Sequence, residues 1–92
     1  MQVTVEYTAQ VKRAAGVAVE SVTLAEPCTV QELVANVAKM HGEGLARLLF
    51  ASDGVLHPSI LLFVGDRQVR WDMAVELQEG DVVTILSPIS GG

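Results

Sequence analysis

The chain has a single cysteine, no basic cluster and no long apolar run. Because Cys28 has no second cysteine to pair with, an internal disulfide is excluded, and a reducing cytoplasm suits such a chain. No apolar stretch approaches the roughly 18 to 20 residues that span a bilayer. The first residues, MQVTVEYT, alternate in polarity instead of forming the basic and apolar regions of a secretion signal. We therefore expect a soluble cytoplasmic protein without a membrane partner.

Basic residues are few, with six Lys and Arg against eleven Asp and Glu, giving a net charge of −5. Since they are scattered, the stripe of phosphate contacts that a nucleic-acid partner requires is missing. His41 and His57 have no cysteine or carboxylate at metal-ligand spacing, so we predict no metal site. A phosphate-binding loop and a catalytic triad are also missing. We predict a protein that binds no cofactor itself and is not catalytic alone.

What the chain does have is enough apolar sequence for one modest core, because half of its 92 residues are hydrophobic. Alternating polarity predicts strands over residues 2–8, 17–24, 68–71 and 82–86, and a wholly apolar strand over residues 60–64. In the second strand the apolar positions change from Val17 and Val19 to Val22 and Leu24. This change predicts a bulge near Ser21.

One main helix is predicted from Thr29 onward. Thr29 and Glu32 have the spacing of a capping box, apolar residues then recur at helical spacing, and Gly42 ends the pattern. A short turn or helix over residues 9–15 is closed by Gly16, a further helical turn covers residues 45–50, and residues 51–58 form a loop.

The order of these elements predicts an α+β fold: a mixed four- or five-stranded sheet with one main helix across one face. Closing the core places the last strand beside the first and parallel to it, with the third strand on its other side. Leu61 and Phe63 then lie beside Leu86 on the face away from the helix. If they are exposed there, they form a docking surface. The alternative is that Arg and Gln side chains, or the loop over residues 51–58, cover them.

We divide the chain into a domain over residues 1–86 and an extended, flexible tail over residues 87–92. Pro88 cannot donate a ladder hydrogen bond, so the sheet should end near Ser87. Because Gly91 and Gly92 lack Cβ atoms, the tail can enter a narrow channel. An ATP-using partner could activate the Gly92 carboxylate as an acyl adenylate, which a sulfur donor or an amine would then displace. The alternative is a tail whose glycines have no role.

Four segments together resemble the ubiquitin-like β-grasp sulfur carriers of the MoaD/ThiS family: VEYTAQVKRAAG, PCTVQELV, LLFVGDRQV and ELQEGDVVTILSPISGG. The last segment is the most specific, although Ser87 stands where the family often has the first proline of a pair. The resemblance is closest to the molybdopterin synthase small subunit. It implies that Gly92 carries the sulfur as a thiocarboxylate, that Gly91, Ser90, Ile89 and Pro88 thread a partner's channel, and that Leu86, Phe63 and Leu61 dock the partner.

The resemblance also implies the partners. These are an E1-like adenylating enzyme that uses ATP, a sulfurtransferase or persulfide donor, and a sulfur-accepting synthase such as the molybdopterin synthase large subunit. VLHPSILLFVGDRQVRW is similar to the longer sulfur carriers of cysteine synthesis, so that pathway stays open. Two further interpretations also stay open: a protein modifier joined through Gly92 to lysines, and a plain interaction module.

Two further residues are candidates for a role. Cys28 lies at the predicted helix entrance, and we predict a structural role for it rather than a nucleophilic one. Trp71 is either a cover for the strand edge or a contact residue.

Overall fold

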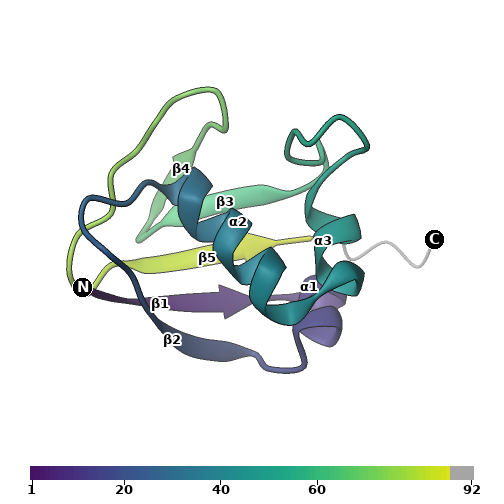
Figure 1. The fold of residues 1–92 in the computed structure, drawn as a ribbon, viewed down its shortest axis with the longest axis horizontal. Coiled ribbons are helices and arrows are strands. Elements are labelled where there is room, and N and C mark those ends of the chain that lie inside the picture. Colours follow the sequence, from purple (N-terminus) through teal and green to yellow (C-terminus); the bar gives the residue numbers. More distant parts are fainter. Residues whose placement is uncertain (88–92) are drawn as a thin grey trace.

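The computed structural model describes residues 1–87 and shows a five-stranded mixed sheet with helices on one face (Figure 1). The strand order is β2-β1-β5-β3-β4, with β1 and β5 parallel and the other neighbours antiparallel. The elements are β1 (Gln2–Tyr7), α1 (Ala9–Ala15), β2 (Val19–Thr23), α2 (Val30–His41), α3 (Glu43–Leu49), β3 (Leu61–Val64), β4 (Arg67–Val69) and β5 (Val82–Leu86). The predicted α+β class and strand arrangement are confirmed, with five strands rather than four.

Helix α2 is the main helix and crosses the sheet, as Figure 1 shows. Its capping box is formed: the Thr29 Oγ1 accepts from the Glu32 N–H at 3.2 Å, and the Glu32 carboxylate accepts from the Thr29 N–H at 2.9 Å. Such a box satisfies backbone donors that no helical carbonyl can reach. The apolar stripe of α2 packs on the sheet with Val30, Leu33, Val34 and Val37 fully buried.

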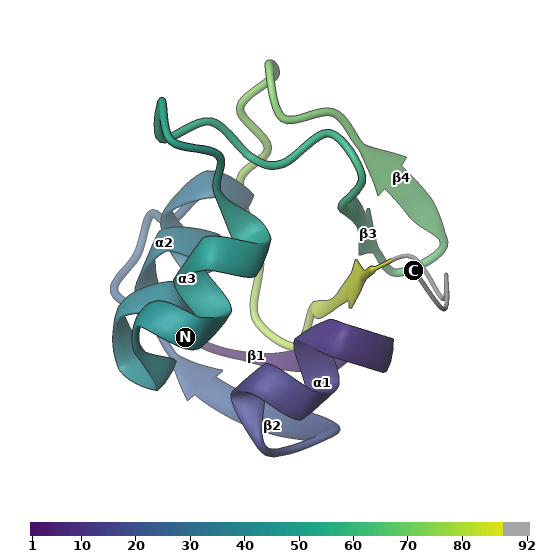
Figure 2. The same ribbon diagram turned by 90° about the vertical axis from the view of Figure 1, so that its right-hand side faces the viewer.

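The two short helices lie at the end of the sheet from which the chain leaves β5 (Figure 2). Helix α1 ends at Gly16, whose φ of 82° is in the left-handed region that glycine adopts without strain. Helix α3 begins at Glu43, two residues earlier than the predicted turn over residues 45–50. Gly42 is the N-cap of this helix, and Gly44 lies inside it instead of preceding it.

Strand β4 is shorter than the predicted residues 68–71 and starts one residue earlier. The turn at Gly65 and Asp66 is tight, so Arg67 already pairs with Val64. The chain then leaves the sheet at Arg70, whose carbonyl accepts a turn hydrogen bond from the Met73 N–H at 3.2 Å.

The predicted bulge near Ser21 is wrong. Strand β2 pairs with β1 in unbroken register, from Gln2 opposite Thr23 to Glu6 opposite Val19. The apolar positions change because the inward position opposite Val5 is occupied by Glu20, while Val19 points outward and is 54% exposed. A polar residue on the inner face, rather than an extra residue, explains the pattern.

Trp71 lies two residues after the end of β4 and is partly buried. Its ring meets the Phe50 ring edge-on, with centroids 5.8 Å apart, and both side chains pack against the core cluster. Cys28 is buried, and burial together with the charge of Glu32 raises the pKa of its thiol. A raised pKa leaves less of the reactive thiolate, in agreement with the predicted structural role. Among the described residues, no helix is long and apolar enough to cross a membrane.

Candidate docking surface and tail root

The outer face of the sheet carries an apolar surface, the docking patch, made of Leu61, Phe63 and Leu86. The antiparallel pairing of β3 with β5 places Leu61 opposite Leu86 and Phe63 opposite Thr84, so all three side chains share the face away from α2. Leu61 is 42% exposed, and Phe63 and Leu86 are partly exposed. The structure therefore brings together the three residues for which docking was predicted.

The loop between α3 and β3 borders the docking patch and leaves Leu61 open. Val55 and Pro58 from this loop, together with Leu61 and Trp71, line a groove of about 370 Å³. Arg70 lies at the same groove, but its guanidinium is held by the Asp72 carboxylate at 2.7 Å. The patch thus continues into an open groove.

Ser87, which we assigned to the tail, is the last described residue and is fixed to the domain. Its side chain is buried, and its Oγ donates to the Thr8 carbonyl at 3.0 Å and accepts from the Val11 N–H at 3.3 Å. Its own N–H donates to the Thr8 Oγ1 at 3.3 Å, and that hydroxyl donates to the Ile85 carbonyl at 3.3 Å. We call these hydrogen bonds the Ser87 clasp. Sequence reasoning did not find Thr8, since no pattern links residues this far apart.

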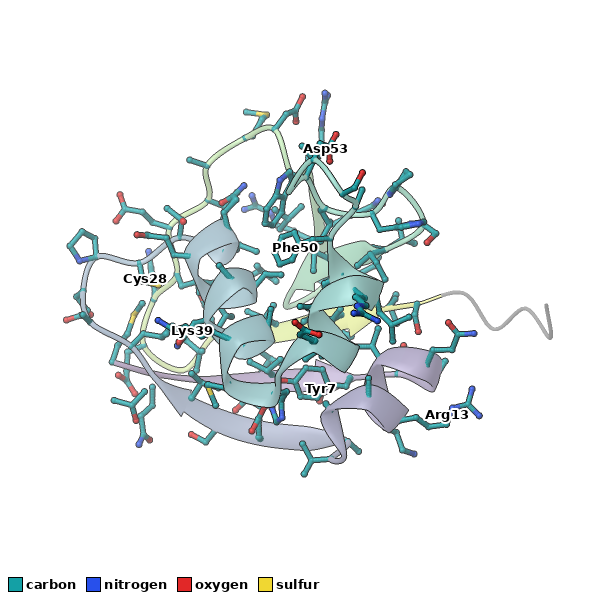
Figure 3. All side chains as sticks on the ribbon, turned by 45° about the vertical axis from the view of Figure 1, so that its right-hand side comes forward. Tyr7, Arg13, Cys28, Lys39, Phe50 and Asp53 are labelled. Atoms are coloured by element: carbon teal, nitrogen blue, oxygen red, sulfur yellow. The ribbon has the colours of Figure 1, made fainter. Side chains whose placement is uncertain are left out.

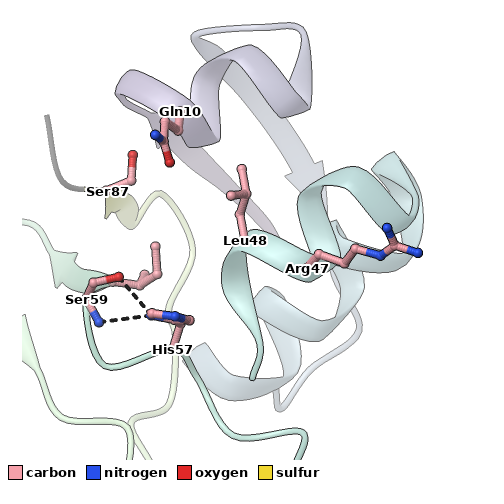
Figure 4. A pocket seen from close by; sticks show the side chains of 7 residues that line it. Gln10, Arg47, Leu48, His57, Ser59 and Ser87 are labelled. Carbon is pink, nitrogen blue, oxygen red and sulfur yellow. Dashed lines mark hydrogen bonds between the residues drawn. The ribbon is translucent and has the colours of Figure 1, made fainter. Parts of the chain in front are cut away.

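A small hollow of about 140 Å³ lies beside Ser87 (Figure 4). It is lined by Gln10, Arg47, Leu48, His57, Ser59, Ile60 and Ser87. The His57 Nδ1 accepts from the Ser59 N–H at 3.3 Å and contacts the Ser59 Oγ at 2.8 Å, which closes a local turn. Among the described residues, no group of three His, Cys, Asp or Glu side chains could hold a metal ion.

The residues predicted to carry the chemistry, Gly92 and the preceding Gly91, Ser90, Ile89 and Pro88, lie outside the described residues. Their roles stay predictions. What the structure adds is the surface from which they start, because Leu86 belongs to the docking patch and Ser87 follows it directly.

A second polar cluster, which the sequence did not reveal, lies on the inner face. The Glu20 carboxylate accepts from the Tyr7 hydroxyl at 2.5 Å and contacts the His41 Nε2 at 2.6 Å. The Tyr7 and His41 rings meet edge-on, and Figure 3 shows Tyr7 between the sheet and the end of α2. The cluster links β1, β2 and α2.

The hydrogen bonds of this cluster decide its protonation. Burial alone would raise the pKa of Glu20, but the hydrogen bonds from Tyr7 and His41 and the charge of His41 outweigh it and lower that pKa. Burial, followed by the hydrogen bond and charge of Glu20, raises the pKa of Tyr7. The cluster therefore consists of an ionised carboxylate and a neutral phenol, an arrangement that holds elements together.

The fold is that of a ubiquitin-like β-grasp protein, with a partly exposed apolar surface on the outer face of β3 and β5. A family model described as "ThiS family" matches residues 5–92, so the chain belongs to this family of ubiquitin-like sulfur carriers. A protein of Archaeoglobus fulgidus named "Putative sulfur carrier protein" is 37% identical over 70 residues, covering 74% of this chain and 78% of that protein.

Solved structures agree with this assignment. The crystal structure of SAMP1 from Haloferax volcanii has a TM-score of 0.87 at 22% identity over 100% of both chains, which shows the shared fold. "Putative molybdopterin converting factor, subunit 1" from Pyrococcus furiosus has a TM-score of 0.76 at 32% identity, over 96% of this chain and 98% of that chain. A chain in the crystal structure of the BexX/CysO complex of Amycolatopsis orientalis has a TM-score of 0.70 at 30% identity, over 98% of this chain and 99% of that chain.

Proposed function

We propose that this protein is a sulfur-carrying co-substrate whose reactive group is the C-terminal carboxyl of Gly92. The observation that carries the proposal is the position of the docking patch, which ends at Leu86 directly before the clasped Ser87 and the Gly-Gly tail. A partner that binds the patch would receive the tail at a defined place.

The chemistry belongs to partners. An E1-like enzyme would let the Gly92 carboxylate attack the α-phosphorus of ATP, forming the acyl adenylate and releasing pyrophosphate. The terminal sulfur of a persulfide on the donor or sulfurtransferase would then attack the carbonyl carbon, with AMP leaving, to give an acyl disulfide. A thiol would cleave the S–S bond of that acyl disulfide, which releases the thiocarboxylate and leaves the thiol and the donor sulfur joined as a disulfide. The folded domain contributes binding energy, and the tail delivers the sulfur at high effective concentration.

The acceptor that we favour is a molybdopterin precursor, with this chain as the small subunit of molybdopterin synthase. Its support is the 32% identity to the Pyrococcus furiosus protein, whose name states the role of a molybdopterin converting factor subunit. Carriage of sulfur for cysteine or another thio-metabolite, and conjugation through Gly92 to lysines, are the competing outcomes of the test.

The test compares the full chain with a chain lacking Gly92, each incubated with the E1-like enzyme, ATP and a sulfur donor. We expect pyrophosphate release only with the full chain, and intact-mass spectrometry should find one oxygen replaced by sulfur. Because methionine oxidation adds nearly the same mass, the change must be localised to the fragment containing Gly92.

The melting temperature is the matched control, since the buried core and the Ser87 clasp are formed by residues that the shortened chain keeps. We expect it to be unchanged by the deletion.

The purified thiocarboxylate is then offered to the molybdopterin synthase large subunit with the precursor, and to a cysteine-forming synthase. Activation that persists without Gly92 would refute the proposal, and Gly92-linked conjugates without thiocarboxylate would favour a protein modifier.

A further inference from the structure

The Ser87 clasp is a structural feature that the chemistry of the tail does not explain. Ser87 uses both its backbone N–H and its hydroxyl to hold Thr8 and the first turn of α1. Thr8 in turn is tied to β5 through the Ile85 carbonyl. Ser87 is thus fixed on two sides, to the strand that it follows and to the helix beside it.

The clasp depends on a serine at position 87, where the resemblance to the family leads one to expect the first proline of a pair. A proline at position 87 would have no N–H to donate to the Thr8 Oγ1 and no hydroxyl for the Thr8 carbonyl or the Val11 N–H. Serine supplies all of these groups. Hydrogen bonds therefore restrict the backbone at position 87, as the ring of a proline would do by fixing φ. Ser87 is also buried, which shields the bonds from competing water.

Leu86, a member of the docking patch, immediately precedes Ser87. Fixing Ser87 therefore fixes the separation and the direction between the bound patch and the first residue of the tail. Less conformational freedom is left to lose when the tail enters a partner's channel, and this loss is a main cost of ordering a chain.

We infer that Thr8 and Ser87 are positioning residues for the activation of Gly92: the clasp aims the tail from the docking patch into the partner's active site. This inference rests on the proposed function. It means that Thr8, which is far from the tail in sequence, affects the rate at which Gly92 is adenylated.

The kinetic test measures pyrophosphate release by the E1-like enzyme with ATP as the carrier concentration is varied. Thr8→Val and Ser87→Ala each remove two hydrogen bonds of the clasp. We expect each to lower the rate at saturating carrier by at least about threefold to tenfold, which is the net size of one lost hydrogen bond. The half-saturating concentration should change less than about twofold, because the docking patch is intact. The double variant should be no slower than the slower single variant, since both changes break one clasp.

Conservative and matched variants separate positioning from general damage. Ser87→Thr keeps the N–H and the hydroxyl and should retain the wild-type rate within about twofold. Thr4→Val and Ser21→Ala make the same chemical changes at the outer face of β1 and β2 and should have no effect. Equal rates for all variants, or a rate loss matched by these controls, would overturn the inference.

A second measurement reports the clasp without any partner. Amide hydrogen exchange at Ser87 should be slow in the wild type and should quicken at least about tenfold in Thr8→Val, while Val83 and Ile85 keep their protection. Fast exchange at Ser87 in the wild type would overturn the clasp itself. If the wild type shows protection but is never adenylated, the proposed function fails and the positioning role falls with it, although the clasp stands.

Discussion

The two faces of the sheet are built from alternate residues of the same strands, yet they differ in how far their side chains are buried. On the inner face, Leu62 and Ile85 are almost completely buried beneath the helices, whereas their neighbours Leu61 and Leu86 point outward and remain partly exposed. Because the chemical type is the same, burial alone separates the residues that hold the fold from those available to a partner.

Leu61, Phe63 and Leu86 keep part of their surfaces in water, so each should contribute less to folding than a fully enclosed neighbour. An exposed apolar cluster also carries a risk of aggregation, and in soluble domains such clusters usually mark an interaction site. We therefore expect residues one position apart to serve stability and partner binding separately, and substitutions of neighbouring residues can test this.

The largest expected effect is on the inner face. Leu62→Ala removes a fully enclosed side chain and should destabilise the domain by about 2–5 kcal/mol, the transfer and cavity cost of such a change. For a domain of this size each kcal/mol lowers the melting temperature by about 4–8 °C. Urea and thermal unfolding would measure both quantities.

Leu61→Ala is the matched control, because it makes the same change one position along β3. Its cost should be below about 1 kcal/mol, as for other partly exposed sites. Equal destabilisation by the two variants would mean that the outer face is part of the core, and the division between the faces would be lost.

The next effect is on partner binding. Phe63→Ala should weaken binding to the E1-like enzyme at least about tenfold, since aromatic residues at the centre of an interface dominate its energy. The melting temperature should change far less than in Leu62→Ala. Isothermal titration calorimetry with the purified enzyme would give the dissociation constant.

Val19→Thr tests whether binding to the E1-like enzyme depends on where an exposed apolar side chain lies or only on its exposure. Val19 is 54% exposed on the outer face, but it belongs to β2, which β1 and β5 separate from β3. Binding should be unchanged within about twofold. A loss as large as that of Phe63→Ala would extend the docking surface across the whole sheet and remove its link with the tail root.

Much of the fold could be predicted because its signals are local. The capping box at Thr29 and Glu32 is a four-residue pattern, and the alternation of β3 and β5 already indicated that Leu61, Phe63 and Leu86 share a face. Pairing rules then supplied the neighbours of each strand.

What could not be predicted depends on contacts between distant residues. Glu20 looks like an outward strand residue until Tyr7 and His41 give it partners, and this is why a bulge was predicted in place of a partly buried carboxylate. The Ser87 clasp was missed for the same reason. Single Ser and Thr residues have no periodicity, and only the parallel pairing of β1 with β5 brings Thr8 to Ser87.

The smallest effect concerns the one acidic side chain that the inner face accommodates. The folded-state pKa of Glu20 is lowered, so its ionised form adds stability that is fully present above the ordinary glutamate pKa of about 4.3. This stability is lost as pH falls through the lower folded-state value. Glu20→Gln should therefore be less stable than wild type at pH 7, and the difference should shrink as pH falls below about 4.3.

Urea unfolding of both proteins across pH 3 to 8 would test this expectation, and Glu6→Gln provides the outer-face control. Glu6 has a single hydroxyl partner, Thr84 at 3.2 Å, whereas Glu20 has a phenol and an imidazole beneath a helix. Between pH 3 and 5, the unfolding free energy of Glu6→Gln should follow that of the wild type more closely than the unfolding free energy of Glu20→Gln does. If the two variants gave the same pH dependence, the hydrogen bonds of the inner cluster would contribute nothing specific, and the inner face would tolerate a carboxylate as readily as the outer face does.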